Sequence, residues 1–435
     1  MNYLSKPRSI SWLVLAASVL VCFGMWRWAG HVLVPVYTAR AIARGRPIGN
    51  NSDLYPVWLT AREVLLQGKT PYSAQLTGDI QKGFYGRELD PKNPADPKDL
   101  QAFAYPLYVV FLLAPTVTLP FATVVEAFRW LLLICTSLAV PLWMSAIGFR
   151  PGWLLTASAM VLAVSNFSAV VQDRQQNLSA LVVLLLAGSI AATVRHWLSL
   201  SGFLLALSTI KPQLSGLLIL WMLLWAVSRW EERRRMVISF GATLVSLLAA
   251  ATSISPHWIP GFLAAVRAYR SYAMGPSVFR AMLPPVLATL VMTVLMVFAG
   301  AFGWKWRNAQ PGSTQFAWAL ALLATVTVSL TTRAYQPLLF PALLVLVASA
   351  NAIRKTSFLV RTLAKGILAC LLWQWGTALG LAFCSMFEPP SRLQNVAELP
   401  MYTLFALPAL TLLVVVGAIL LIGAPPIKLD EPMYS

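Results

Sequence analysis

Long runs of apolar residues, each closed by a short polar or charged segment, recur along almost the whole chain. A helix needs about 20 apolar residues to cross the hydrocarbon core of a bilayer, and fewer where it is broken or shielded by protein. We therefore predict about a dozen spans. Their ranges are 11–26, 123–147, 154–170, 178–194, 202–210, 214–227, 236–254, 283–302, 316–330, 337–350, 366–386 and 401–422, and 106–119 is predicted to be a half-span or re-entrant piece.

Composition supports the same class of protein. The chain is 58% hydrophobic and 11% charged, whereas a soluble domain has roughly 45–50% apolar and about 25% charged residues. We predict an all-α polytopic membrane protein of about 11–13 transmembrane helices, forming one integral membrane domain over 1–435. The first span is expected to be a retained anchor. A first extracytoplasmic loop is expected at 34–105, and a short cytoplasmic tail at 424–435.

The charge is strongly positive, with a formal net charge of +18. The longest basic run, 229–235, lies between apolar segments and lacks the extended basic face of a nucleic-acid-binding protein. We therefore expect no nucleic-acid partner and attribute the excess to membrane topology and to anionic membrane lipids. With the N-terminus in the cytoplasm, the cytoplasmic segments carry roughly twice as many Lys and Arg residues as the short outer loops, as the positive-inside rule requires.

Cysteines and histidines show no metal or disulfide pattern. The four cysteines lie in or beside apolar segments without a CxxC pair, and the three histidines are far apart in the sequence. Such cysteines are typical of small buried hydrophobic residues. We expect no metal site and no cofactor.

The loop 34–105 contains seven of the 15 acidic residues of the chain. A loop this long in a compact protein is usually functional. Within it, Leu54, Trp58, Ala61 and Leu65 recur at helical spacing and predict an amphipathic helix over 53–66 on the outer surface, ended by Gly68 and Pro71.

Two charged residues have both a structural and a catalytic interpretation. Asp53, at the start of the predicted loop helix, is either an N-cap or a general base that deprotonates an acceptor hydroxyl. Lys211 either extends to the lipid headgroups or binds a phosphate. The Lys211-Pro212 pair closes the short segment 202–210, which indicates broken helices that line a cavity.

Other polar groups fall on the same predicted outer side. The stretch 172–177 is rich in side-chain donors, and its structural interpretation is a solvated turn with a weak Asp173/Arg174 pair. Arg333, Tyr335 and Gln336 form another outer cluster. Glu126 and Arg129, three residues apart, are expected to pair.

Four short motifs in order resemble those of the bacterial alpha-1,2-mannosyltransferase-like family, membrane glycosyltransferases of the C-type (GT-C) fold that use polyprenyl-phosphate sugars. The motifs are Asp53-Leu54-Tyr55 through Gly68-Lys69-Thr70-Pro71-Tyr72, Phe103-Ala104-Tyr105-Pro106, Gln175-Gln176-Asn177-Leu178 and Ile210-Lys211-Pro212-Gln213. They cover about the first half of the chain. In the late outer loop, the stretch 329–336 has Tyr335-Gln336 where family members often carry a histidine.

The resemblance implies a GT-C-like bundle in the bacterial plasma membrane, with an extracytoplasmic active site. It implies inverting transfer of one sugar, mannose or another hexose, from a polyprenyl-phosphate donor to a lipid-linked or glycan acceptor. Asp53 would be the general base, and no cofactor would be needed. The donor phosphate would be bound by Lys211, Arg174 and Arg333, and the substrates by Tyr55, Tyr105, Gln176, Asn177, Gln213, Tyr335 and Gln336.

Two other functions remain open from the sequence. A transporter or lipid flippase would also have broken helices and charges in a cavity, although transporters usually show matched broken segments in two internal repeats, and none is visible. An inactive relative of the GT-C enzymes is the other alternative, because the late-loop histidine is missing.

Overall fold

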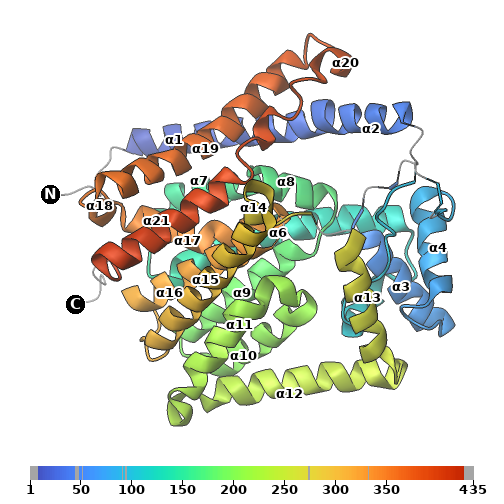
Figure 1. Ribbon diagram of the computed structural model, residues 1–435, viewed down its shortest axis with the longest axis horizontal. Helices are drawn as coiled ribbons and strands as arrows, with labels where there is room; N and C mark the ends of the chain where they lie inside the picture. The colour runs from blue at the N-terminus through green and yellow to red at the C-terminus, as the bar shows by residue number, and fades with distance from the viewer. Residues whose placement is uncertain are drawn as a thin grey trace.

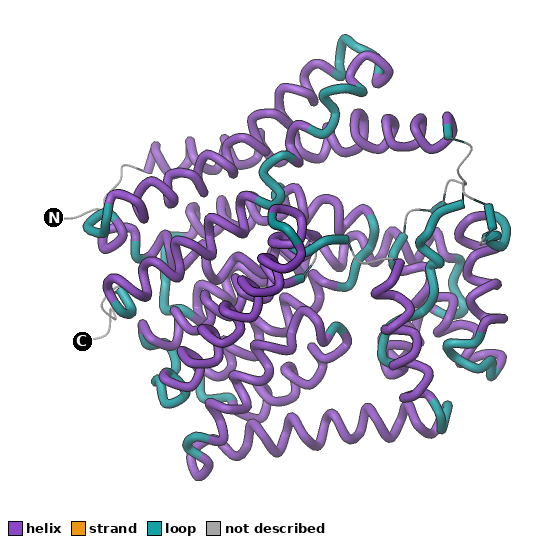
Figure 2. The backbone as a smooth tube through the Cα atoms, viewed as in Figure 1, coloured by secondary structure: helices purple, strands orange, loops and turns teal. Residues whose placement is uncertain are grey.

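In the computed structural model, every regular element of the described residues is a helix (Figure 2). The structure describes residues 8–44, 49–50, 52–90, 92–93, 96–272, 275–331 and 333–425. The protein is therefore an all-α polytopic membrane protein, as the hydropathy pattern predicts.

The number of long helices is smaller than the number of predicted spans. Among the described residues, 6 helices are long and apolar enough to cross a membrane, or 7 if one bent pair is a single span. They are Ser9–Ala43, Phe121–Ala146 (α6), Trp230–Ile254 (α12), Pro285–Lys305 (α15), Phe358–Cys384 (α19) and Leu399–Ile422 (η6 Leu399–Met401 with α21 Ala406–Ile422), and the bent pair is α7 (Trp153–Val164) with α8 (Phe167–Arg174).

The other predicted spans are shorter apolar helices of 10–17 residues. A helix of 17 residues is only about 25 Å long. They are Leu107–Thr116, Ser179–Val194 (α9), Leu198–Ile210, Pro212–Val227 (α11), Thr314–Leu330 (α16) and Gln336–Ala348. The segment Leu107–Thr116 consists of η2 (Leu107–Val109), α5 (Val110–Leu113) and η3 (Ala114–Thr116), Leu198–Ile210 contains α10 (Leu198–Leu207), and Gln336–Ala348 contains α17 (Phe340–Ala348).

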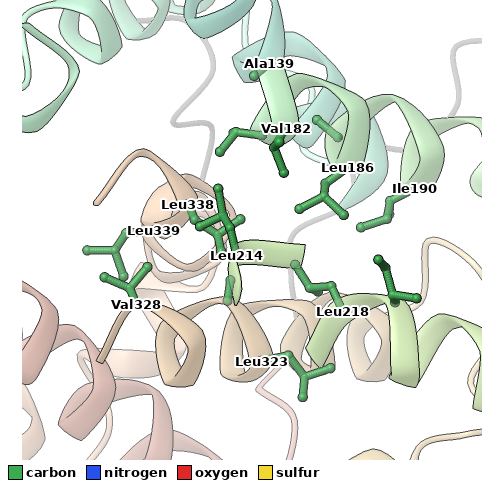
Figure 3. Packing of buried hydrophobic residues seen from close by; sticks show 14 of the residues in the cluster. Ala139, Val182, Leu186, Ile190, Leu214, Leu218, Leu323, Val328, Leu338 and Leu339 are labelled. Carbon is green, nitrogen blue, oxygen red and sulfur yellow. The ribbon is translucent and has the colours of Figure 1, made fainter. Parts of the chain in front are cut away.

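Of these short helices, α9 and α16 lie inside the bundle, whereas α10, α11 and α17 each have exposed apolar side chains. In α16 every residue from Phe316 to Ser329 is buried, so protein, not lipid, surrounds this helix. Figure 3 shows Leu214 and Leu218 of α11 between Val182 and Leu186 of α9 on one side and Leu323 of α16 on the other. A helix that is apolar on all sides and enclosed by neighbours does not need the full width of the bilayer.

The first helix is longer than its apolar run. It continues from α1 (Arg8–Trp28) through a π-helical turn, η1 (Ala29–Leu33), into α2 (Val34–Ala43). The predicted span ends at Trp26 because polar and charged residues follow it. Those residues end the apolar run but not the helix, since its backbone hydrogen bonds are internal in lipid and in water alike. The first ten residues of the predicted loop are therefore helical.

Two further helices, α3 (Leu54–Gln67) and α4 (Ala74–Tyr85), form the body of the loop. We call α3 with its N-cap Asp53, α4 and the segment from α4 to Tyr105 the loop unit. The predicted loop helix is confirmed, and it ends at Gly68, whose φ of 64° is left-handed as a glycine C-cap allows. It is not a surface helix, however. Val57 and Val64 are buried in addition to Leu54, Trp58 and Ala61, because α4, α5 and η3 pack on α3.

Two pairs of consecutive bundle helices are separated by a break in the helical backbone. The predicted break at Lys211 is confirmed: α10 ends in a 3-10 turn, η4 (Ser208–Ile210), and α11 begins at Pro212. The predicted span 154–170 is wrong as one helix, because α7 and α8 meet at an angle of 59°. The Asn166 side chain accepts a hydrogen bond from the Ser168 backbone N–H and so caps a new helix within the apolar run.

The loop unit lies at one end of the bundle, and the start of α1 and the end of α21 lie at the opposite end (Figure 1). The connection after α12 adds α13 (Trp258–Tyr272) and α14 (Val278–Met282). Helix α13 packs against the loop unit through Phe262 and Tyr72, whose ring centroids are 6.4 Å apart. The remaining short helices are α18 (Ala350–Ile353) and α20 (Pro390–Leu393).

Candidate active site

The turn that follows α8 presents a polar side chain toward the loop unit. Gln176 has a left-handed φ of 48°, and the Gln176 and Asn177 backbone N–H groups donate to the carbonyls of Asp173 and Gln172 at 2.9 and 2.8 Å. These paired bonds close the end of a helix in a Schellman arrangement. The reversal directs Asn177 away from the axis of α8.

Gln176 itself stabilises this turn. Its Nε2 donates to the backbone carbonyls of Asp173 at 2.9 Å and Arg174 at 2.7 Å. The predicted solvated turn is wrong: Gln172 to Arg174 belong to α8, and Gln172, Asp173 and Gln176 are each less than 5% exposed. A buried turn must satisfy its own backbone carbonyls, which explains the use of the Gln176 side chain.

Lys211 lies at the break between η4 and α11. Its backbone leaves the helical region, with φ −131° and ψ 76°, and Pro212 begins the next helix without needing an N–H partner. The side chain is only 4% exposed. Its Nζ donates to Asn177 Oδ1 at 2.5 Å and to Ser179 Oγ at 2.9 Å, so the ammonium is directed into the protein and does not extend to the surface.

Asp53 reaches the same turn from the loop unit. Its backbone N–H donates to the Gln175 carbonyl at 2.7 Å, and its Oδ2 accepts from Asn177 Nδ2 at 2.6 Å. The residue occupies the N-cap position of α3, but its side chain makes no capping hydrogen bond. The carboxylate therefore faces the bundle, and the structure does not support the capping interpretation of this side chain.

The amide of Asn177 joins the two charged residues. Its nitrogen donates to the Asp53 carboxylate, while its oxygen accepts from the Lys211 ammonium and from the backbone N–H and hydroxyl of Ser179. An amide next to an acceptor-only carboxylate and a donor-only ammonium can satisfy both in this orientation alone. Asp53, Asn177 and Lys211, from three separate parts of the sequence, thus form one cluster.

The electrostatic environment of Asp53 favours a proton acceptor. Burial raises the pKa of the Asp53 carboxyl above its ordinary value, while the hydrogen bond from Asn177 and the charge of Lys211 act in the lowering direction. Within the part of the chain that the structure describes, Oδ1 accepts no hydrogen bond, and Asp53 is only partly buried. One oxygen is thus positioned by Asn177 and the other can receive a proton.

The other predicted residues divide between this cluster and the protein core. The Tyr105 ring centroid lies 5.6 Å from Lys211 Nζ, and Gln213 is exposed at the start of α11. In contrast, Tyr55 packs its ring on Phe121 of α6 at 4.8 Å, and Gln336 is buried, with its Nε2 donating to the Leu404 carbonyl at 2.7 Å.

Arg333 and Tyr335 begin the 3-10 helix η5 (Arg333–Leu339), which packs on α8 and α9. Their side chains lie outside the described part of the structure. Arg174 lies in a different set of contacts from Lys211. Its guanidinium is directed toward α1, where it lies 5.8 Å from the Trp26 ring centroid.

Two residues near the cluster were not predicted. Ser179 contacts both Asn177 and Lys211, and the Asn-x-Ser pattern before an apolar run was a usable capping signal. The other is Asp99 of the loop unit. Burial is the main cause that raises the pKa of its carboxyl, and the negative charge of Asp53 raises it further. Among the described residues no three His, Cys, Asp or Glu side chains are grouped in a way that could hold a metal ion.

No protein-family model matches this sequence, and no curated protein matches it either.

Proposed function

We propose that the protein is an inverting glycosyltransferase that moves one sugar from a polyprenyl-phosphate donor to an acceptor hydroxyl at the outer face of the bacterial plasma membrane. The observation that carries the proposal is the link through Asn177, which holds a carboxylate and an ammonium on opposite sides of one amide. The four-motif resemblance supplies the donor class, with mannose or another hexose as the sugar and a lipid-linked or glycan acceptor.

The chemistry needs a base and a cation. The acceptor oxygen attacks the anomeric carbon from the face opposite the phosphate, and its proton passes to Asp53 Oδ1. As the carbon–oxygen bond to the phosphate breaks, its electron pair stays on the phosphate oxygen, where negative charge grows. A buried ammonium such as that of Lys211 stabilises such charge well, because few water molecules compete with it.

Asn177 has a positioning role in this proposal. Its amide lies between the Asp53 carboxylate and the Lys211 ammonium and contacts both groups. It also fixes one carboxylate oxygen, so that the other is presented at a constant angle. Displacement of a catalytic group by 1 Å can cost a factor of about 100 in rate.

The decisive experiment measures sugar transfer in membranes that contain the protein, using a panel of labelled polyprenyl-phosphate sugars. We expect Asp53→Asn to reduce transfer by about 10²–10⁴-fold, because the base is lost, and Lys211→Met to reduce it by about 10²–10³-fold. The matched control is Asp90→Asn, an exposed acid in the same loop, which should transfer at the wild-type rate.

Equal transfer by wild type and Asp53→Asn would contradict the assignment of the base. Accumulation of the labelled lipid or sugar across sealed vesicles, without any transfer product, would instead support a transporter or flippase. An absence of both activities with every donor would favour an inactive relative.

A further inference from the structure

A second candidate site lies on the other side of the turn after α8. A cavity of about 380 Å³ is lined by Trp26, Arg129, Trp130, Leu133 and Arg174. These residues come from α1, α6 and the end of α8, whereas the cluster around Asn177 is formed by the loop unit, the turn and the break before α11. The proposed glycosyl transfer does not use this cavity.

The arginines of the cavity differ in how well they are paired. Arg129 is held by Glu126 at 2.8 Å, as predicted, and its Nε lies 4.0 Å from the buried carboxylate of Asp173. Arg174 makes one long hydrogen bond of 3.5 Å, to the Trp26 carbonyl, and its buried Nε has no partner within the described residues. A buried N–H group without a partner is costly unless a ligand completes it.

The backbone of the first helix makes room for Arg174. A π-helical turn at Ala29–Leu33 interrupts the α-helix there, and such turns are frequent at functional sites. A Cβ atom built on Gly30 would lie 2.7 Å from Arg174 Nη2. Glycine at this position therefore permits the guanidinium to lie against the helix.

The surroundings of the cavity are those of the membrane interface. Trp130 is 65% exposed on a helix apolar enough to span a bilayer, so its indole faces lipid. Arg129 lies eight residues after the start of α6 at Phe121, about 12 Å along the axis from the end that carries the loop unit. Tryptophans are enriched at the depth of the headgroups, where lipid phosphates are found.

We propose that this cavity binds the phosphate group of a membrane lipid, with the lipid chain along the outer surface of α6 beside Trp130 and Leu133. A guanidinium binds phosphate through two parallel hydrogen bonds. Arg174 contributes a buried Nε–H group that has no partner among the described residues, while Glu126 and Asp173 orient Arg129. The phosphate can belong to a polyprenyl phosphate or to a glycerophospholipid of the same leaflet. This inference does not rest on sugar transfer.

The test is an equilibrium binding measurement on the purified full chain in detergent, with native mass spectrometry to count bound molecules. The probes are undecaprenyl phosphate, phosphatidylglycerol and inorganic phosphate. Because hydrogen bonds to charged groups contribute about 1.5–3 kcal/mol each, we expect Arg174→Gln or Arg129→Gln to weaken lipid binding by about 10- to 100-fold. Gly30→Ala, which keeps both charges but displaces Arg174, should give a smaller loss.

The matched control is Arg392→Gln, which removes an exposed arginine whose partner is also a nearby glutamate and should bind as the wild type does. Preference for undecaprenyl phosphate would identify a polyprenyl site, and equal binding of both lipids would identify a general headgroup site. An unchanged number of bound lipid molecules, at wild-type affinity, in the Arg129→Gln/Arg174→Gln double variant would overturn the inference. So would binding of inorganic phosphate as tight as that of the lipids.

The two proposals fail separately. The two arginine variants test the lipid site, and Asp53→Asn tests the proposed transfer. If this variant still transfers sugar while the arginine variants lose lipid, the proposed function fails and the lipid site remains.

Discussion

At the scale of single residues, the protonation of Asp53 sets the pH dependence of the proposed reaction. Since burial raises the pKa of this carboxyl, the base is lost by protonation at a higher pH than an ordinary aspartate, whose pKa is about 3.9. We expect the rate of transfer to fall as the pH falls through this raised pKa. A pH–rate profile at saturating donor measures the midpoint.

The hydrogen bond from Asn177 stabilises the charged form of Asp53, so its removal should raise the pKa further. The acidic limb of the profile should therefore move to higher pH in Asn177→Leu, and the maximal rate should fall because the carboxylate is no longer positioned. A profile for Asn177→Leu that coincides with that of the wild type would exclude a role for this amide.

Individual site residues could be predicted from the sequence where local chemistry was visible. Asp53, Asn177 and Lys211 stand in short motifs of unusual polarity between apolar segments, and the structure brings them together. Arg174 stands in the same polar stretch as Asn177, but its direction depends on where α1 and α6 pack, which no local pattern encodes. The burial of Gln336 and Tyr55 is likewise set by neighbours that are distant in the sequence.

At the scale of helices, the contact between α10 and α12 depends on one glycine. A Cβ atom on Gly202 would lie 2.1 Å from the Met236 carbonyl oxygen, so Gly202→Ala must separate two backbones. Overpacking of this kind costs about 1–3 kcal/mol or more, and we expect a lower unfolding temperature in detergent.

The control for this prediction is Gly216→Ala in α11, where a new Cβ atom meets no other atom within 4 Å. Removing a helical glycine there should stabilise the protein by about 0.5–1 kcal/mol. If the two variants unfold at the same temperature, close backbone contact does not limit the α10–α12 packing.

Helix boundaries followed the sequence where caps coincided with changes in hydropathy, as at Gly68 and Pro212. They departed from it where the two signals disagreed. Asn166 begins a new helix inside a continuous apolar run, and the first helix continues to Ala43 beyond the apolar residues. A hydropathy pattern reports the solvent around a segment, whereas capping and internal hydrogen bonds determine where the helix ends.

At the scale of the whole molecule, the loop unit and the start of α12 lie at opposite ends of the bundle (Figure 1). The positive-inside rule assigns the basic start of α12 to the cytoplasm. We expect a membrane-impermeant maleimide to label Lys92→Cys in intact cells and Arg235→Cys only after permeabilisation, each in a chain whose native cysteines are replaced. Both positions are exposed. The reverse pattern would place the loop unit, and with it Asp53, in the cytoplasm.

The lengths of the bundle helices were the feature of the whole molecule that hydropathy described least well. Short buried helices such as α16 have the same composition as spans, because a helix surrounded by other apolar helices and one surrounded by lipid meet similar neighbours. Helix length distinguishes a short buried helix from a span, and this length is known only once the breaks between consecutive helices have been located.

The candidate site is divided between the loop unit and the helix bundle, and this division has a consequence for how substrate selectivity can change among related proteins. The loop unit contributes the carboxylate of Asp53, and the bundle contributes the ammonium of Lys211. A hydrogen bond from the Asp53 backbone N–H to the Gln175 carbonyl joins the loop unit to the bundle without using either charged group. Under the proposed function, a loop unit grafted from a related protein that keeps this one bond and the aspartate should change the acceptor preference and leave donor binding unaltered. Selectivity for the two substrates can then be inherited, and engineered, one at a time.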